Sequence, residues 1–207
     1  MAKISNEINR NSVLFLYEGE TEAEFYQKIF TEYVPPRKIR RNYSNLKGVY
    51  SLNDKVRSRI DSYLLNGSFD DRKNIHVFVA YDREGTKNTE TLLNIDQIKT
   101  EYINPSSRIS SINEIVATQD LESWFFHDLE GIYKFLRVPN AKRNYSQYNN
   151  IEATNNRILS ALFHRFDKHY QKGRKVHGFI DHLDIEKIFN NVQELKESVT
   201  LITKLCK

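Results

Sequence analysis

The chain has 207 residues, 39% of them hydrophobic and 28% charged, and its formal net charge is +4. This length and composition predict one globular domain with its own core, and the longest apolar runs fall far short of the roughly 20 residues of a membrane span. No signal peptide is visible, and the single cysteine, Cys206, excludes an internal disulfide. We therefore expect a cytoplasmic protein without membrane contact, whose mild positive charge permits nucleic-acid binding without requiring it.

The first strong pattern is an apolar run that ends in a glutamate. Residues 13–17, Val-Leu-Phe-Leu-Tyr, predict a strand that is covered on both faces, as in a parallel sheet. Glu18 follows at its carboxyl end, Gly19 supplies a turn, and Thr21 with Glu24 predicts a capping box at the start of a helix. Open α/β sheets bind ligands outside the carboxyl ends of their strands, so Glu18 is a candidate functional residue. A plain solvated turn is the alternative.

A basic segment follows the two prolines, at residues 35–36, that end this helix. It predicts either a strip that grips phosphates, with tyrosines offering surfaces for bases, or a solvated loop with a short strand at residues 38–43. The basic residues of this strip are Arg37, Lys38, Arg40, Arg41 and Lys47, with Tyr33, Tyr43 and Tyr50 interleaved.

The second strong strand pattern also runs into acidic residues. Residues 75–81 follow an amphipathic helix expected at residues 52–65 and lead directly into Asp82 and Glu84. Side chains two residues apart on extended backbone point the same way, so Asp82 and Glu84 are placed to face one ion.

The third predicted strand, at residues 109–118, follows a helix capped by Thr89 and is itself followed by Asp120 and Glu122. A helix with a broad apolar face is expected over residues 121–136. Asp120 is either a functional carboxylate or only the N-cap of that helix, with Glu122 in its first turn.

Three strands that each end in carboxylates, with a helix after each, predict an α/β fold with a small parallel sheet flanked by helices. Right-handed crossovers place the carboxyl ends of such strands on one side of the sheet, so the acids are expected to converge there. We expect residues 1–137 to form this core. Residues 138–207 are expected to form a helical C-terminal extension that packs on the same domain.

This C-terminal part begins with an Asn-rich exposed loop that contains Lys142 and Arg143. A second basic stretch ends at residue 177 and contains Arg174 and Lys175. Both stretches are candidates for contact with a nucleic-acid backbone.

Convergent carboxylates flanked by bases fit phosphoryl chemistry. Carboxylate oxygens suit Mg²⁺ or Mn²⁺, and ions held in this way stabilise the attacking and leaving oxygens of a phosphodiester displacement. The sequence has no Gly-x-Ser-x-Gly elbow, no Gly-Lys-Ser/Thr phosphate loop, no His-Glu-x-x-His motif and too few cysteines to hold zinc. Residues 82–86, Asp-Arg-Glu-Gly-Thr, are superficially similar to the Asp-x-Asp-Gly-Thr motif of haloacid-dehalogenase-type phosphatases. A small-molecule phosphatase is therefore kept as an alternative.

Three segments together carry a resemblance to a known family: residues 17–22 (Tyr-Glu-Gly-Glu-Thr-Glu), 81–85 (Tyr-Asp-Arg-Glu-Gly) and 120–125 (Asp-Leu-Glu-Ser-Trp-Phe). The chain resembles the small stand-alone Toprim-like proteins, which are related to the nuclease domains of the OLD family and to the RloB and DUF4276 type proteins of prokaryotic defence and restriction islands. The resemblance covers roughly residues 12–130 and, less closely, 170–200.

The resemblance implies a role for each matching residue. Glu18 matches the first glutamate of the Toprim pattern, Asp82 and Glu84 its acidic pair, Glu122 a later acid, and Lys175 a lysine after the long helix; these five are the expected catalytic residues. Glu84 departs from the usual aspartate and is one methylene longer, which is expected to shift the ion. The expected metal ligands are Glu18, Asp82, Glu84, Glu122 and Asp120.

The leading hypothesis is a Mg²⁺- or Mn²⁺-dependent nuclease that hydrolyses phosphodiester bonds in DNA or RNA, working with a partner ATPase in prokaryotic anti-phage defence. The alternatives are a non-catalytic Toprim-like subunit that binds nucleic acid or regulates an ATPase, and the phosphatase described above. A homodimer is left open. The residues expected to contact nucleic acid are Arg37, Lys38, Arg40, Arg41, Lys142, Arg143 and Arg174.

Overall fold

The computed structural model describes residues 10–36, 38–48, 50–66, 74–83 and 93–207. Arg37, Glu84 and the predicted helix cap Thr89 lie outside these described residues. None of the helices within the described ranges is long and apolar enough to cross a membrane.

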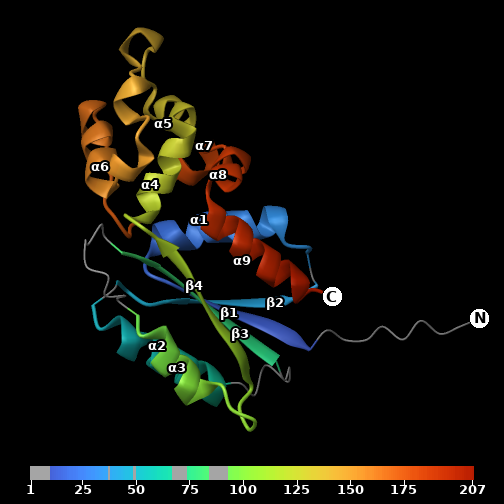
Figure 1. Cartoon of the computed structure of the whole chain (residues 1–207). Helices are drawn as coiled ribbons and strands as arrows, with labels where there is room; N and C mark the ends of the chain where they lie inside the picture. The colour runs from blue at the N-terminus through green and yellow to red at the C-terminus, as the bar shows by residue number, and fades with distance from the viewer. Residues whose placement is uncertain (1–9, 37, 49, 67–73, 84–92) are drawn as a thin grey trace, which may run out of the picture.

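The described residues form a sheet of four parallel strands in the order β2-β1-β3-β4, with helices on both faces (Figure 1). The predicted α/β fold is therefore confirmed. The strands are β1 (Asn11–Tyr17), β2 (Arg40–Asn45), β3 (Asn74–Asp82) and β4 (Ile109–Ala117).

Both faces of the sheet are buried because its central strands carry hydrophobic side chains on each side. In β1, Val13 and Phe15 belong to the hydrophobic cluster on one face, whereas Leu14 and Leu16 belong to the cluster on the other. This alternation explains why the first strand reads as an unbroken apolar run in the sequence.

The first face is covered by the larger helical layer, which includes the C-terminal part of the chain (Figure 1). One aromatic cluster runs through this layer, from Phe15 of β1 and Phe25 to Phe125, Phe163 and Phe179. The helices after residue 138 therefore share one core with the sheet. The helices that build this layer around the cluster are α1 (Glu20–Tyr33), α6 (Asn156–Arg165), α7 (Phe179–His182), α8 (Ile185–Asn191) and α9 (Gln193–Lys204).

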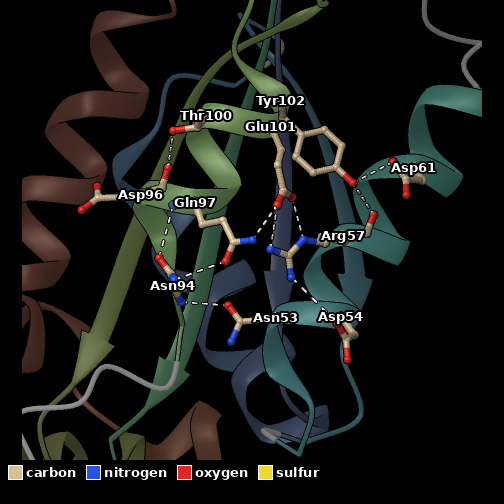
Figure 2. A network of polar contacts seen from close by, with 10 residues as sticks. All are labelled: Asn53, Asp54, Arg57, Asp61, Asn94, Asp96, Gln97, Thr100, Glu101 and Tyr102. Carbon is tan, nitrogen blue, oxygen red and sulfur yellow. Dashed lines mark hydrogen bonds and ion pairs between the residues drawn. The ribbon is translucent and has the colours of Figure 1, made fainter.

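The second face is covered by two helices, α2 (Leu52–Leu65) and α3 (Ile95–Tyr102). The bounds of α2 are those predicted from its apolar spacing. A polar network joins the two helices on their outer side (Figure 2). Arg57 donates two hydrogen bonds to the carboxylate of Glu101, at 2.6 and 3.0 Å, and the Tyr102 hydroxyl donates to Asp61 at 2.8 Å.

Two local predictions differ from the structure. The helix expected over residues 121–136 is interrupted at Asp128, whose backbone leaves the helical region and whose buried carboxylate accepts the amide of Asp184 at 2.8 Å. The predicted capping box is also wrong, since Gly19 is the N-cap of α1 and the Thr21 hydroxyl donates to the Arg174 carbonyl at 2.9 Å. The interrupted helix consists of α4 (Leu121–Phe125), a 3₁₀ turn (Phe126–Asp128) and α5 (Leu129–Leu136).

The stability of the second layer depends on a few buried side chains of α2. Ile60 is fully buried against the sheet, whereas Leu65 on the same helix is 85% exposed. We expect Ile60→Ala to lower the free energy of unfolding by about 2–5 kcal/mol, because it leaves a cavity in a packed core. Leu65→Ala is the control, with an expected change within about 0.5 kcal/mol. Urea unfolding measures both, and equal effects of the two variants would contradict this packing.

Candidate functional site

The two central strands, β1 and β3, are adjacent in the sheet but not consecutive in the chain. The chain leaves β1 toward β2 on one side and leaves β3 toward β4 on the other. Such a change of direction opens a crevice outside the carboxyl ends of the two strands, which is where open α/β sheets bind ligands. Glu18 directly follows β1 and Asp82 ends β3, so both carboxylates stand at this crevice.

Three buried carboxylates meet there, and we call Glu18, Glu22 and Asp82 the carboxylate site. One oxygen from each side chain lies within 4.8 Å of an oxygen of each of the others. Glu22 comes from the first turn of α1. The backbone amide of Asp82 donates to Glu18 Oε1 at 2.9 Å, and the amide of Leu121 donates to Asp82 Oδ1 at 3.0 Å. The structure thus brings Glu18 and Asp82 together and adds Glu22.

Removal from water makes these carboxylates harder to ionise. Burial raises the pKa of Glu18 to about 8 and that of Glu22 to about 7, and the nearby charge of Asp82 adds to both shifts. Burial also raises the pKa of Asp82 to about 6, although the ammonium group of Lys172 opposes this rise. All three groups therefore titrate within reach of neutral pH, as groups at functional sites often do.

Glu22 is the least compensated of the three. Its side chain is buried, yet neither of its oxygens has a hydrogen-bond partner among the described residues. The amides of Glu22 and Gly19 offset part of the rise in its pKa without reaching hydrogen-bond geometry. Buried carboxylates are normally paired with donors or with a metal ion. Oxygen donors of this kind are the ligands of Mg²⁺ and Mn²⁺, so the residues present fit such an ion.

A loop of the C-terminal part, residues 171–174, lies across the crevice and supplies a cation. Lys172 Nζ is 2.8 Å from Asp82 Oδ2. The amide of Glu20 donates to the Gly173 carbonyl at 2.9 Å and holds the loop to the start of α1. Gly19 permits this approach, because a Cβ at that position would lie only 2.6 Å from the Cα of Gly173.

A cavity of about 710 Å³, which we call the main cavity, is lined by Glu18 and Glu22 of the carboxylate site. The 171–174 loop forms one part of its wall, and the chain after β2 forms another. The basic side chains in its lining are Lys47, Lys172 and Arg174. Acids at the base of the cavity and cations in its wall are the arrangement that a metal-assisted site for phosphate requires.

The two later acids are engaged elsewhere. Asp120 is the N-cap of α4, as the alternative reading predicted, and also accepts the backbone and side-chain nitrogens of Asn156 at 2.7 and 2.8 Å. Glu122 is fully buried and accepts the hydroxyl of Tyr170 at 2.6 Å. Burial raises the pKa of Glu122 well above its usual value, and Asp82 adds to this rise. Asp120 and Glu122 thus lie outside the three-carboxylate group formed by the described residues, although the charges of Asp82 and Glu22 act on Glu122, whose second oxygen accepts no hydrogen bond from the described residues.

The predicted phosphate-binding residues are spread over the molecule. Arg174 lines the main cavity, while Lys175 pairs with Glu24 at 3.3 Å. The register of β2 on β1 pairs Arg40 with Ser12, at the amino ends of the strands. Lys38 and Arg41 flank Arg40 in the chain and belong to the same end, which is opposite to the carboxylate site.

The last two predicted contact residues, Lys142 and Arg143, belong to the helical part. Arg143 Nη1 donates to the carboxylate of Glu130 in α5, at 2.8 and 3.0 Å. The segment around them forms the outer end of the helical part, away from the sheet (Figure 1).

Sequence reasoning missed two members of the site, Glu22 and Lys172. A local signal for Glu22 was present, because it lies in the first turn of the helix that directly follows the strand end carrying Glu18. No local signal marks Lys172 among the neighbouring bases of its stretch. Its contact with Asp82 spans 90 residues of chain and depends on how the helical part folds back.

Fold and site together define an α/β protein with a buried carboxylate site at the switch point of a parallel sheet. A family model described as "Domain of unknown function (DUF4276)" matches residues 17–202, and the chain belongs to this family. No curated protein and no solved structure matches the chain. Its activity is therefore argued from the site.

The raised pKa values predict how stability depends on pH. Glu18, Glu22 and Asp82 have a higher pKa in the folded chain than in the unfolded chain, so the folded state holds more protons between about pH 4 and pH 8. Without divalent ions, we expect the free energy of unfolding to fall as the pH rises through this range. Thermal unfolding between pH 5 and pH 8.5 tests this. The triple variant Glu18→Gln, Glu22→Gln, Asp82→Asn should flatten the dependence, and an unchanged slope would contradict it.

Lys172 is expected to compete with a bound cation. Its ammonium group stands 2.8 Å from an oxygen of Asp82, so a divalent ion there meets like charge. We predict that Lys172→Met tightens Mn²⁺ binding about tenfold in calorimetry, since it removes this repulsion. Lys175→Met, which removes a lysine paired with Glu24, is the control and should leave the affinity within about twofold. Weaker Mn²⁺ binding by Lys172→Met would overturn the prediction.

Proposed function

We propose that this protein is a Mg²⁺- or Mn²⁺-dependent nuclease of Toprim type that hydrolyses phosphodiester bonds in DNA or RNA. The observation that carries the proposal is the unpaired carboxylate of Glu22, buried beside Glu18 and Asp82 at the base of a cavity with basic walls. A neutral or apolar ligand gives no account of three buried acids that face the same space. A divalent cation and a phosphate together satisfy both the acids and the bases.

Glu18, Glu22 and Asp82 would hold the ion. When bound, such an ion stabilises the charge that develops on a phosphate during displacement. Glu18 accepts the amide of Asp82 through one oxygen and keeps the other for the ion or for a proton, which its pKa of about 8 allows it to carry at neutral pH.

The basic residues of the cavity wall have a different task. Lys47, Lys172 and Arg174 attract the phosphate of the substrate and orient it above the acids. In this proposal Lys172, which pairs with Asp82, makes the phosphate contact that the resemblance to Toprim-like proteins implies for Lys175. With a divalent ion held at Asp82, the ammonium group of Lys172 would be available to contact the phosphate of the substrate.

Glu122 and Asp120 act as positioning residues. The Glu122–Tyr170 hydrogen bond lies in the segment just before the 171–174 loop, and the Asp120–Asn156 contacts tie α4 to α6. These contacts hold the loop and the start of α4 in place, and the amide of Leu121 in turn reaches Asp82. The resemblance to Toprim-like proteins adds a partner ATPase and a role in anti-phage defence to the proposal.

Two other functions have an observation in their favour. The ion pair between Lys172 and Asp82 fills part of the carboxylate site with a protein cation, as a non-catalytic subunit that binds nucleic acid or regulates an ATPase would do. The size of the main cavity, about 710 Å³, also suits a small phosphorylated molecule and hence a phosphatase. Hydrolysis of a phosphomonoester without cleavage of nucleic acid would favour the phosphatase.

Cleavage assays with matched carboxylate variants test the nuclease proposal. We expect Glu22→Gln and Asp82→Asn each to reduce Mg²⁺-dependent cleavage of single-stranded and duplex substrates at least about a hundredfold, because each removes a ligand charge. Glu32→Gln is the matched control. Glu32 lies in the same helix, α1, but is exposed and is not among the residues that line the main cavity, so activity should stay near wild type. Full activity of Glu22→Gln would refute the proposed site.

A further inference from the structure

We infer that the substrate is a single-stranded polynucleotide, and that it is held by two residues that follow β2, Lys47 and Tyr50. This inference rests on the proposed nuclease function and adds the class of nucleic acid to it. We call residues 46–48 and 50–51 the rim loop, because they follow β2 at the edge of the main cavity.

The rim loop has an unusual backbone that is held in place. Lys47 and Ser51 have positive φ angles of 58° and 52°, and the φ of Gly48 is 88°. Lys55 Nζ donates to the carbonyls of Lys47 and Gly48 at 2.9 and 3.1 Å, and the amide of Gly48 donates to the Glu18 carbonyl at 3.1 Å. Non-glycine residues in the left-handed region cost free energy and persist where surrounding contacts enforce them. The backbone at Lys47 and Gly48 is therefore held in one arrangement, and the side chains of the rim loop extend from it.

Those side chains are a cation and an aromatic ring. Lys47 lines the main cavity together with Glu18 and Glu22 of the carboxylate site. Tyr50 is 86% exposed and lies two residues beyond Gly48 of the cavity wall, which places its Cα within about 7 Å of that residue. A large aromatic ring with this exposure makes no contribution to the core. A basic groove with an aromatic platform beside it is the arrangement that proteins use for single strands.

The depth of the carboxylate site argues against an intact duplex. Glu18 and Glu22, which line the main cavity, are 7% and 4% exposed, so a phosphate must enter the cavity to meet them. The cavity volume of about 710 Å³ is that of a small-molecule pocket, and a paired, stacked duplex is far too wide to enter it. A single strand can bend its backbone into the cavity and leave a neighbouring base outside, against Tyr50.

A second cavity offers a place for the next part of the bound nucleic acid. It has a volume of about 340 Å³ and shares Glu20 and Asn45 with the lining of the main cavity. Its own lining adds an aromatic ring, Tyr17, and Lys175 together with its ion-pair partner Glu24. The shared residues place this second cavity beside the main cavity at the start of α1.

Fluorescence anisotropy tests this inference on the full chain, with labelled oligonucleotides in Ca²⁺ and a gel of each sample to detect cleavage. The probes are a single-stranded DNA, the single-stranded RNA of the same sequence, and the corresponding duplex DNA. We expect at least one single strand to bind about tenfold or more tightly than the duplex. Tyr50→Ala should weaken that binding about tenfold, and Tyr50→Trp should restore it, because stacking needs only an aromatic face.

Salt dependence separates the two side chains of the rim loop. Lys47→Ala should lower the slope of log affinity against log salt by about 0.7, the value of one phosphate contact on a single strand, whereas Tyr50→Ala should leave the slope unchanged. Leu65→Ala and Lys134→Ala are matched controls for an exposed hydrophobic and an exposed lysine, at 85% and 63% exposure, and should leave binding unchanged.

The outcomes distinguish this inference from the nuclease proposal. Equal or tighter duplex binding, or wild-type binding by Tyr50→Ala, overturns the inference, while metal-dependent cleavage would still support a nuclease. Tight single-strand binding that depends on Lys47 and Tyr50, without cleavage in Mg²⁺ or Mn²⁺, supports the inference and refutes the nuclease.

Discussion

The structure depends on how three carboxylates are kept out of water within a few ångströms of one another. Buried acids of like charge are costly unless donors, cations or protons compensate them. The Asp82 amide compensates Glu18, and the Leu121 amide and Lys172 compensate Asp82. Glu22 remains without a partner among the described residues. This residual cost is the strongest physical reason to regard the site as functional, since a structural role would not require it.

This constraint explains why the C-terminal helical part is needed. The 171–174 loop reaches Asp82 only because the helices before and after it pack into the same core as α1 and the sheet. Its contacts with Glu20, Thr21 and the close approach at Gly19 fix the loop to the start of the helix that carries Glu22. The carboxylate site therefore forms from two distant parts of the chain, and its geometry is coupled to folding of the whole.

The two ends and the two faces of the sheet have different tasks. The carboxyl ends of β1 and β3 hold the acids, with the rim loop after β2 beside them. Arg40 and its basic neighbours lie at the amino ends. On the second face, α2 and α3 are joined by the Arg57–Glu101 pair (Figure 2). The position of a charged residue along its strand thus decides which end of the sheet it reaches, and a count of basic residues does not reveal this.

Much of this was determined by the sequence alone. Apolar runs of strand length and four-residue spacing in the helices specified the α/β fold and the bounds of α2, because these patterns are local. Strand ends also placed Glu18 and Asp82 at one edge of a parallel sheet. Only the tertiary structure decided the strand order, the approach of Glu22 to Glu18 and Asp82, the pairing of Lys172 with Asp82 and of Lys175 with Glu24, and the position of Asp120 and Glu122 outside the three-carboxylate group. These depend on contacts between residues far apart in the chain, and such contacts follow from packing, which no local pattern records.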